Sequence, residues 1–144
     1  MSLPTLHGTG RLTGDPELRF AKSGTAVTTV NLAFNSRRYD RDQGKWVDGD
    51  VLFIRATIFG DAAENAAETY QRGMEVVISG RVKLDEWEDK NTGEKRSRAA
   101  LLVDSIGPST RSAKAQVVRT GTREQPGDSW PEVKQPATQE EPPF

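Results

Sequence analysis

Hydrophobic and polar residues alternate most clearly over residues 51–59, and this pattern predicts a β-strand. Successive side chains of a strand point to opposite faces. One face of this strand is wholly apolar and suits a core; it carries Leu52, Ile54, Ala56 and Ile58. The other face carries Phe53, Arg55, Thr57 and Phe59. This second face is either an exposed surface with two aromatic rings and a guanidinium, or part of a strand buried on both sides, with Arg55 reaching out at its edge.

Most of the remaining body of the chain reads as short strands separated by turns. Strands are expected at residues 8–12, 26–34, 74–87 and 98–106, with a short extended piece at residues 17–20. Residues 35–50 are polar and contain three arginines and two glycines, so we expect a long mobile loop there. Gly80 interrupts the strand at 74–87, which predicts a bulge or a sharp bend.

One helix is expected, over residues 61–72. Asp61 is a suitable N-cap, and Glu64 three positions later completes a capping-box pattern. Four alanines favour the helix, Tyr70 provides an apolar anchor, and Gly73 is placed as the C-terminal stop.

Three strands, a helix and two further strands are the order of an OB-fold, an all-β five-stranded barrel with one α-helix between its third and fourth strands. A β-sandwich is the alternative, and the single helix in mid-chain argues against it. We expect the barrel in residues 1–110 and an extra C-terminal strand over residues 111–119. Residues 120–144 are rich in Gly, Pro, Gln, Thr and Glu with almost no aliphatic side chains, which predicts a disordered acidic tail.

A length of 144 residues fits one domain with a tail, and 34% hydrophobic residues fits a modest core. The absence of cysteine excludes disulfides and thiolate metal sites. No apolar run approaches the roughly 20 residues of a membrane span, and the N-terminus does not resemble a signal peptide. We therefore expect a cytoplasmic protein with no membrane partner.

The net charge is −1, but its distribution along the chain is uneven. Residues 1–118 carry 17 basic and 16 acidic side chains, whereas residues 119–144 carry 3 and 5. A nucleic-acid site in this chain must therefore be a local concentration of positive charge.

Basic and aromatic side chains are interleaved in three places. The odd-numbered face of the strand at 74–87 carries Arg81, Lys83, Asp85 and Trp87, and we predict that Trp87, near a hairpin tip, is a stacking residue. The predicted loop carries Arg37, Arg38, Tyr39, Arg41, Lys45 and Trp46, which alone is typical of an ordinary solvated loop. The return strand begins with Lys95-Arg96-Ser97-Arg98, a weak signal by itself.

Together these groups meet the requirement for binding single-stranded nucleic acid, in which aromatic rings stack on bases and cations follow the phosphates. Catalysis has little support. His7 is the only histidine, which excludes a histidine metal cluster, and no Walker-type phosphate loop is present. We expect no catalytic residue, no metal and no cofactor; an enzyme such as a nuclease is the alternative.

Several motifs in order resemble the bacterial single-stranded DNA-binding protein family. They are the decapeptide Gly10-Arg11-Leu12-Thr13-Gly14-Asp15-Pro16-Glu17-Leu18-Arg19, then Ile58-Phe59-Gly60, Arg72-Gly73, Ile78-Ser79-Gly80-Arg81 and Trp87. The segment Ile106-Gly107-Pro108-Ser109 with the strand expected after it resembles the actinobacterial branch, in which that strand clamps neighbouring subunits.

The resemblance implies a homotetramer, cytoplasmic and associated with the nucleoid, that coats single-stranded DNA without sequence preference in replication, recombination and repair. The implied stacking residues are Tyr39, Phe53, Phe59 and Trp87. The expected phosphate contacts are Arg37, Arg38, Arg55, Arg72, Arg81, Lys83 and Arg96, of which Arg55 and Arg72 match family basic positions. Asp61, Asp85 and Glu86 stand where relatives often have cations, so a paralogue that binds DNA weakly and acts mainly through protein contacts is the alternative.

The C-terminus resembles the acidic tip through which this family docks replication and repair proteins. It consists of Glu140, Glu141, Pro142, Pro143 and Phe144. A terminal aromatic ring suits an apolar pocket, and the carboxylates suit a basic rim around it. A frayed tail is the alternative reading of these five residues.

Overall fold

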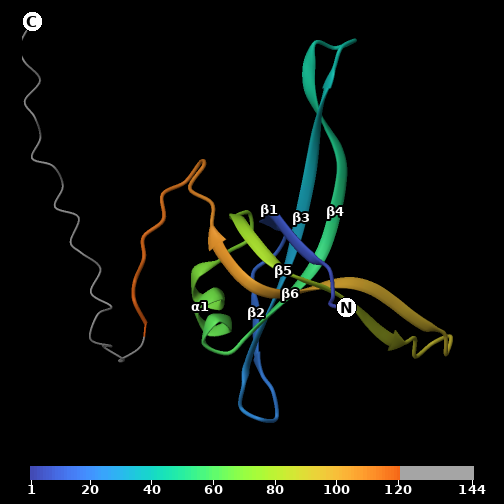
Figure 1. Ribbon diagram of the computed structural model, residues 1–144, viewed down its shortest axis with the longest axis vertical. Coiled ribbons are helices and arrows are strands. Elements are labelled where there is room, and N and C mark those ends of the chain that lie inside the picture. Colours follow the sequence, from blue (N-terminus) through green and yellow to red (C-terminus); the bar gives the residue numbers. More distant parts are fainter. Residues whose placement is uncertain (121–144) are drawn as a thin grey trace, which may run out of the picture.

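A computed structural model describes residues 1–120 of the chain, and strands dominate it (Figure 1). The elements in chain order are β1 (Thr5–Leu12), β2 (Glu17–Phe20), β3 (Ala26–Asp40), β4 (Lys45–Phe59), α1 (Asp61–Thr69), β5 (Glu75–Glu88) and β6 (Lys95–Pro108).

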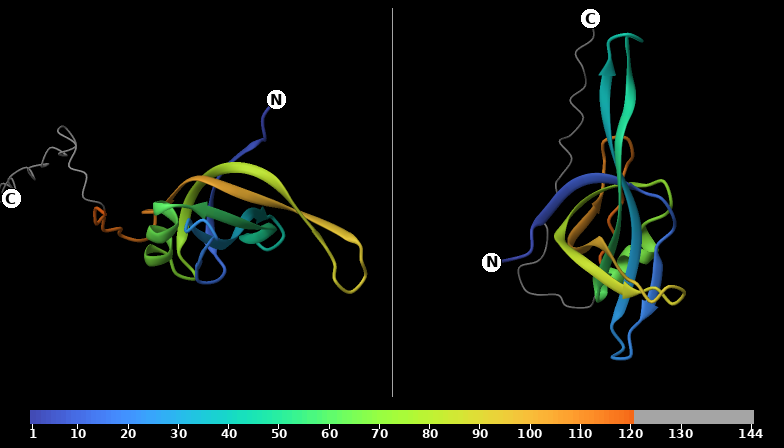
Figure 2. Two further views of the ribbon diagram at one scale, coloured as in Figure 1. Left: turned by 90° about the horizontal axis from the view of Figure 1, so that it is seen from below. Right: turned by 90° about the vertical axis from the view of Figure 1, so that its right-hand side faces the viewer.

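The strands close into a barrel. The sheet order is β1-β5-β6-β4-β3-β2, and β1 pairs with β3 as well as with β5. Five strands therefore form a ring, to which β2 is added along β3, and α1 lies at one end of it (Figure 2). The helix falls between the third and fourth barrel strands, β4 and β5, which confirms the predicted OB-fold and excludes the sandwich.

The barrel core is built from the inward-facing aliphatic side chains. It includes Leu12, Val30, Leu32, Ile54, Ala56, Ile58, Val76, Ile78 and Leu101. Three of the four residues predicted for the inner face of β4 are buried, whereas Leu52 is 52% exposed, because it precedes the stretch of β4, Arg55 to Thr57, that pairs with β6. On the other face, Phe53 is 71% exposed and Phe59 is 50% exposed. The interpretation of β4 as a strand buried on both faces is therefore wrong.

The prediction of a long mobile loop over residues 35–50 is wrong. β3 continues to Asp40 and β4 begins at Lys45, so most of this stretch is a two-stranded ribbon that projects from the barrel (Figure 1). Its pairs include Arg37 opposite Asp48 and Tyr39 opposite Trp46. Opposite charges and aromatic pairs across a ladder stabilise a ribbon that has no core beneath it. The β5–β6 hairpin projects in the same manner from another part of the barrel.

The helix is shorter than predicted and is capped differently. The N-cap is Gly60, with φ of 74° and no side-chain hydrogen bond, so Asp61 is already helical and the predicted capping box is wrong. Asp61 and Glu64 still lie in the first turn, where negative charge suits the helix dipole. The helix ends at Thr69; Tyr70 is buried as predicted, and this burial raises the pKa of its hydroxyl.

Gly80 marks a register shift between β5 and β6, which confirms the predicted bulge. A Cβ atom at this position would collide with the carbonyl oxygen of Leu102 and press on the side chain of Leu101. Only glycine therefore fits where β5 crosses β6 at the barrel wall.

Residues 109–120 carry no strand, so the strand expected over 111–119 is not formed within the single chain. Because such a clamp would pair with a neighbouring subunit, that role stays a prediction. Almost all of the tail expected over 120–144, including the docking tip, lies outside the described residues. Within residues 1–120, no helix is long and apolar enough to cross a membrane.

Candidate nucleic-acid interface

The strand register brings most of the predicted site residues to one outer face of the barrel. Ala100 of β6 pairs with Arg55 of β4 on one side and with Lys83 of β5 on the other. In the next row, Leu102 pairs with both Thr57 and Arg81. Directly paired residues point to the same face of a sheet, so these cations share one surface. We call this surface the platform; it comprises Phe53, Arg55, Thr57, Phe59, Arg81, Lys83, Trp87 and Arg96.

The aromatic rings of the platform are exposed to solvent although they are large and apolar. Trp87 is 44% exposed, less than Phe53 and Phe59. The guanidinium carbon of Arg98 lies 5.2 Å from the centroid of the Trp87 ring, a cation–π contact. Arg98 therefore covers one part of the indole and helps to orient it, leaving the exposed part available to a ligand.

Sequence reasoning noted Arg98 only within a weak basic run. The structure places it opposite Asp85, two residues from the Trp87–Arg96 pair. Only the register of β5 against β6 reveals this, because the turn of the hairpin decides which side chains meet. The one signal in the sequence that could have placed Arg98 on this face was the alternation of side chains along the return strand.

Tyr39 lies further out along the β3–β4 ribbon, with its ring edge-on to Trp46 at 5.7 Å between centroids. β4 has one extra residue between Val51 and Asp48, so its alternation changes there. As a result, Trp46 and Asp48 point to the same side of the ribbon as Phe53. The ribbon thus extends the platform with a second aromatic pair, of which only Tyr39 was predicted as a site residue.

Four of the seven predicted phosphate contacts form ion pairs on the surface. The pairs are Arg37–Asp48 at 3.8 Å, Arg81–Asp104 at 3.4 Å, Lys83–Asp85 at 3.1 Å and Arg96–Asp89 at 2.9 Å. Pairs as exposed as these stabilise a fold by only about 0–1 kcal/mol each. A phosphate can therefore replace the carboxylate at small cost, but each such pair lowers the positive potential of the free surface.

Two of the predicted phosphate contacts lie away from the platform. Arg38 pairs with Val47 and points to the opposite side of the ribbon from Arg37. Arg72 lies in the turn after α1, where its backbone N–H donates to a carboxylate oxygen of Asp15 at 2.9 Å. Within residues 1–120, neither of these arginines nor Arg55 forms an ion pair.

The described residues contain no group of three or more His, Asp or Glu side chains arranged to hold a metal ion. His7 is exposed on β1, opposite Ser79 of β5, and forms no ion pair within the described part of the chain. What the platform offers to a ligand is stacking on its exposed aromatic rings and ionic contacts with its cations.

The model of the single-strand binding protein family matches residues 5–109, which span the whole barrel. The chain belongs to this family. A single-stranded DNA-binding protein of Paenarthrobacter aurescens is 48% identical over 116 residues, which cover 81% of this chain and 67% of the relative. One from Mycobacterium bovis is 49% identical over 113 residues, covering 78% and 68%. These relatives confirm the predicted membership and its actinobacterial type.

A solved structure supports the same assignment at the level of the fold. The crystal structure of a small single-stranded DNA-binding protein from Streptomyces coelicolor aligns with a TM-score of 0.66 and 25% sequence identity. The alignment covers 76% of this chain and 97% of the other. The Streptomyces coelicolor protein thus shares the barrel on which the platform is built.

Proposed function

We propose that this member of the single-strand binding protein family binds single-stranded DNA through the platform, without sequence preference and without catalysis. The observation that carries the proposal is the register that places Arg55, Lys83 and Arg81 in adjoining rows, beside exposed aromatic rings. Every base has a π-face, so stacking on Phe53 and Trp87 is independent of sequence. The relatives named single-stranded DNA-binding protein support this role.

We further propose that the protein coats and protects single strands during replication, recombination and repair, in the cytoplasm at the nucleoid. In this proposal it acts as a homotetramer and recruits partner proteins through its C-terminal residues, Glu140, Glu141, Pro142, Pro143 and Phe144. The support is the combination of an aromatic terminus with adjacent carboxylates, which suits an apolar pocket with a basic rim.

A paralogue that binds DNA weakly is the second candidate, and the surface ion pairs favour it. Three aspartates each form an ion pair with a cation that would otherwise be free to contact a phosphate. The pairs are Lys83–Asp85, Arg81–Asp104 and Arg96–Asp89. We favour DNA binding because these pairs are exposed and weak, whereas stacking supplies about 1–3 kcal/mol per base.

Titration of the full chain with fluorescently labelled oligo-dT at two salt concentrations tests the proposal. We expect binding at low salt that weakens as salt rises, with a slope of log K against log[salt] of about −0.7 for each phosphate neutralised. Arg55, the platform cation that forms no ion pair within residues 1–120, predicts a slope of about −0.7, and the four platform cations together predict about −3. A duplex of equal length should bind more weakly, because its bases are not available for stacking.

Two results would contradict the proposal. Absence of oligo-dT binding at low salt would leave the paralogue that acts through protein contacts. Cleavage of the oligonucleotide on addition of Mg²⁺ would show an enzyme instead, whereas we expect the strand to stay intact.

A further inference from the structure

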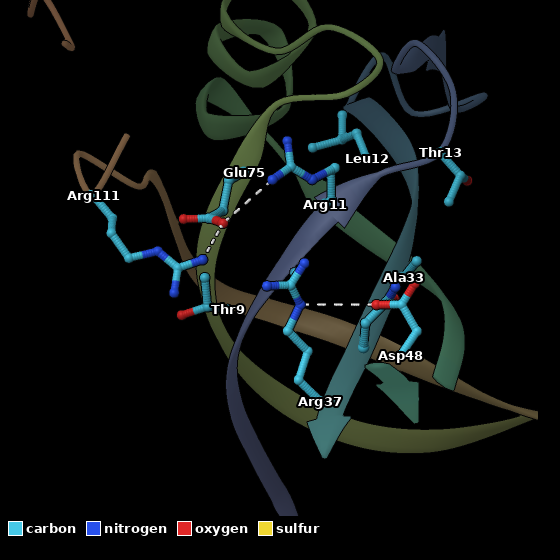
Figure 3. A pocket seen from close by; sticks show the side chains of 11 residues that line it. Thr9, Arg11, Leu12, Thr13, Ala33, Arg37, Asp48, Glu75 and Arg111 are labelled. Carbon is cyan, nitrogen blue, oxygen red and sulfur yellow. Dashed lines mark hydrogen bonds and ion pairs between the residues drawn. The ribbon is translucent and has the colours of Figure 1, made fainter. Parts of the chain in front are cut away.

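A groove of about 640 Å³ lies beside the platform, where β1, β3 and the segment after β6 come together (Figure 3). Arg11 of β1 pairs with Ala33 of β3, and Ala33 pairs with Phe53 of β4. These three residues therefore form one row on the outer face of the barrel. The groove thus begins one strand away from an aromatic ring of the platform.

Three arginines from separate segments meet in this groove with two carboxylates. Arg11 and Arg111 both approach one oxygen of Glu75, at 3.5 and 2.8 Å. Arg37 lies 3.8 Å from Asp48 on the neighbouring ribbon (Figure 3). The groove therefore carries a net charge of +1, because the single carboxylate of Glu75 is shared by two arginines.

The depth of the charges makes the groove more positive than its net charge suggests. The side chain of Glu75 is 10% exposed, whereas those of Arg11 and Arg111 are 59% and 77% exposed. The carboxylate lies on the floor and the guanidinium groups lie at the rim. The Ser109 hydroxyl and the Arg111 guanidinium hold the pKa of Glu75 below its usual range, which favours the charged carboxylate that both arginines contact.

The arginines are oriented in advance and keep donors for a ligand. Arg11 donates one N–H to the carbonyl oxygen of Gly73 at 2.8 Å, in addition to its ion pair with Glu75. A guanidinium has five N–H donors, so an internal carboxylate and a carbonyl leave others directed to solvent. Forked donors held in position are the usual partners of phosphate oxygens.

We propose that this groove is a second phosphate-binding site, which holds the phosphodiester backbone of a strand after it leaves the platform past Phe53. Arg11 and Arg111 are the contacting residues, and Glu75 positions both. The inference rests on the proposed binding of single-stranded DNA and adds a path for the strand over β1. An acidic peptide is the other ligand that such a groove fits, and the row that joins it to Phe53 favours the DNA backbone.

The test compares a short and a long strand on the full chain. Oligo-dT of about 4 nucleotides occupies only the platform, whereas about 16 nucleotides is the upper end of the site size of one OB-fold. In Arg11→Gln and in Arg111→Gln we expect the salt slope for the long strand to become shallower by about 0.7, with the short strand unaffected. Lys22→Gln is the matched control, because it removes one charge from the turn between β2 and β3, away from the groove.

Asp48→Asn should change the affinity for the long strand in the opposite direction to the two arginine variants. It frees Arg37 at the groove and should tighten binding of the long strand more than that of the short one. An unchanged slope for the long strand in both arginine variants would overturn the second site. Equal losses for both strand lengths would also overturn it, since the arginines would then belong to the platform. Failure of the wild-type chain to bind either strand would instead contradict the proposed function itself.

Discussion

Replacing Trp87 by alanine should weaken binding of oligo-dT about 5- to 150-fold. Base–aromatic stacking contributes about 1–3 kcal/mol per base, and each 1.4 kcal/mol is a factor of ten in affinity. Phe53→Ala should have an effect of the same order, because that ring is 71% exposed and has no role in the core. The measurement is a fluorescence anisotropy titration with labelled oligo-dT at a single salt concentration.

Phe20→Ala is the matched control for these two variants. Phe20 is 62% exposed, but it pairs with the buried Ala26 and so lies on the opposite face of β2 from Arg19, which shares the row of Phe59. Its loss should leave affinity unchanged. The salt slope should also stay the same in Trp87→Ala, since no charge is removed, and light scattering should show an intact assembly. An unchanged affinity in Trp87→Ala would show that this ring is not a stacking residue.

Replacing Gly80 by alanine should destabilise the barrel by about 3 kcal/mol, the upper end of the usual cost of overpacking. The added methyl group would meet the carbonyl oxygen of Leu102, which belongs to the backbone of β6 and cannot move without disturbing the β4–β6 ladder. For a domain of about 100 residues, this corresponds to a melting temperature lower by roughly 15 °C. Thermal unfolding followed by circular dichroism measures the effect.

Gly14→Ala is the control for this substitution. No heavy atom lies within 4 Å of a Cβ built at Gly14, and its backbone is not in the left-handed region. We expect its melting temperature to stay within a few degrees of the wild type, with all variants compared at one protein concentration because assembly shifts apparent stability. A Gly80→Ala variant as stable as Gly14→Ala would show that β5 and β6 can separate at the bulge without cost.

The parts of the fold that the sequence predicted are those in which burial imposes a period. The alternation over residues 51–59 separated the two faces of β4 because one of them is buried, and the run from Val76 to Ile78 identified β5 for the same reason. The ribbon over residues 35–50 could not be found in this way. Its strands pair outside the barrel, so no core selects a hydrophobic period, and its polar side chains resemble those of a loop.

The site was predictable residue by residue, but its geometry was not. The candidates on β4 and β5 follow from alternation within each strand, whereas their common rows depend on β6, which lies between them. Arg98 and Arg11 depend wholly on register, because each meets its partner across a strand pair. The ion pair between Arg81 and Asp104 was equally hidden, since the two residues are distant in the sequence.

In the proposed function, the single strand lies on one surface, the platform. The most direct test uses the full chain with Trp46→Phe and Trp130→Phe, so that Trp87 is the only tryptophan. Arg98 covers one part of the indole, and a base stacking on the exposed part should quench its emission as oligo-dT saturates the protein. We expect the midpoint of this quenching to equal the dissociation constant measured by anisotropy. Unchanged Trp87 emission at saturating oligo-dT, with affinity retained, would show that the strand binds elsewhere and would contradict the account.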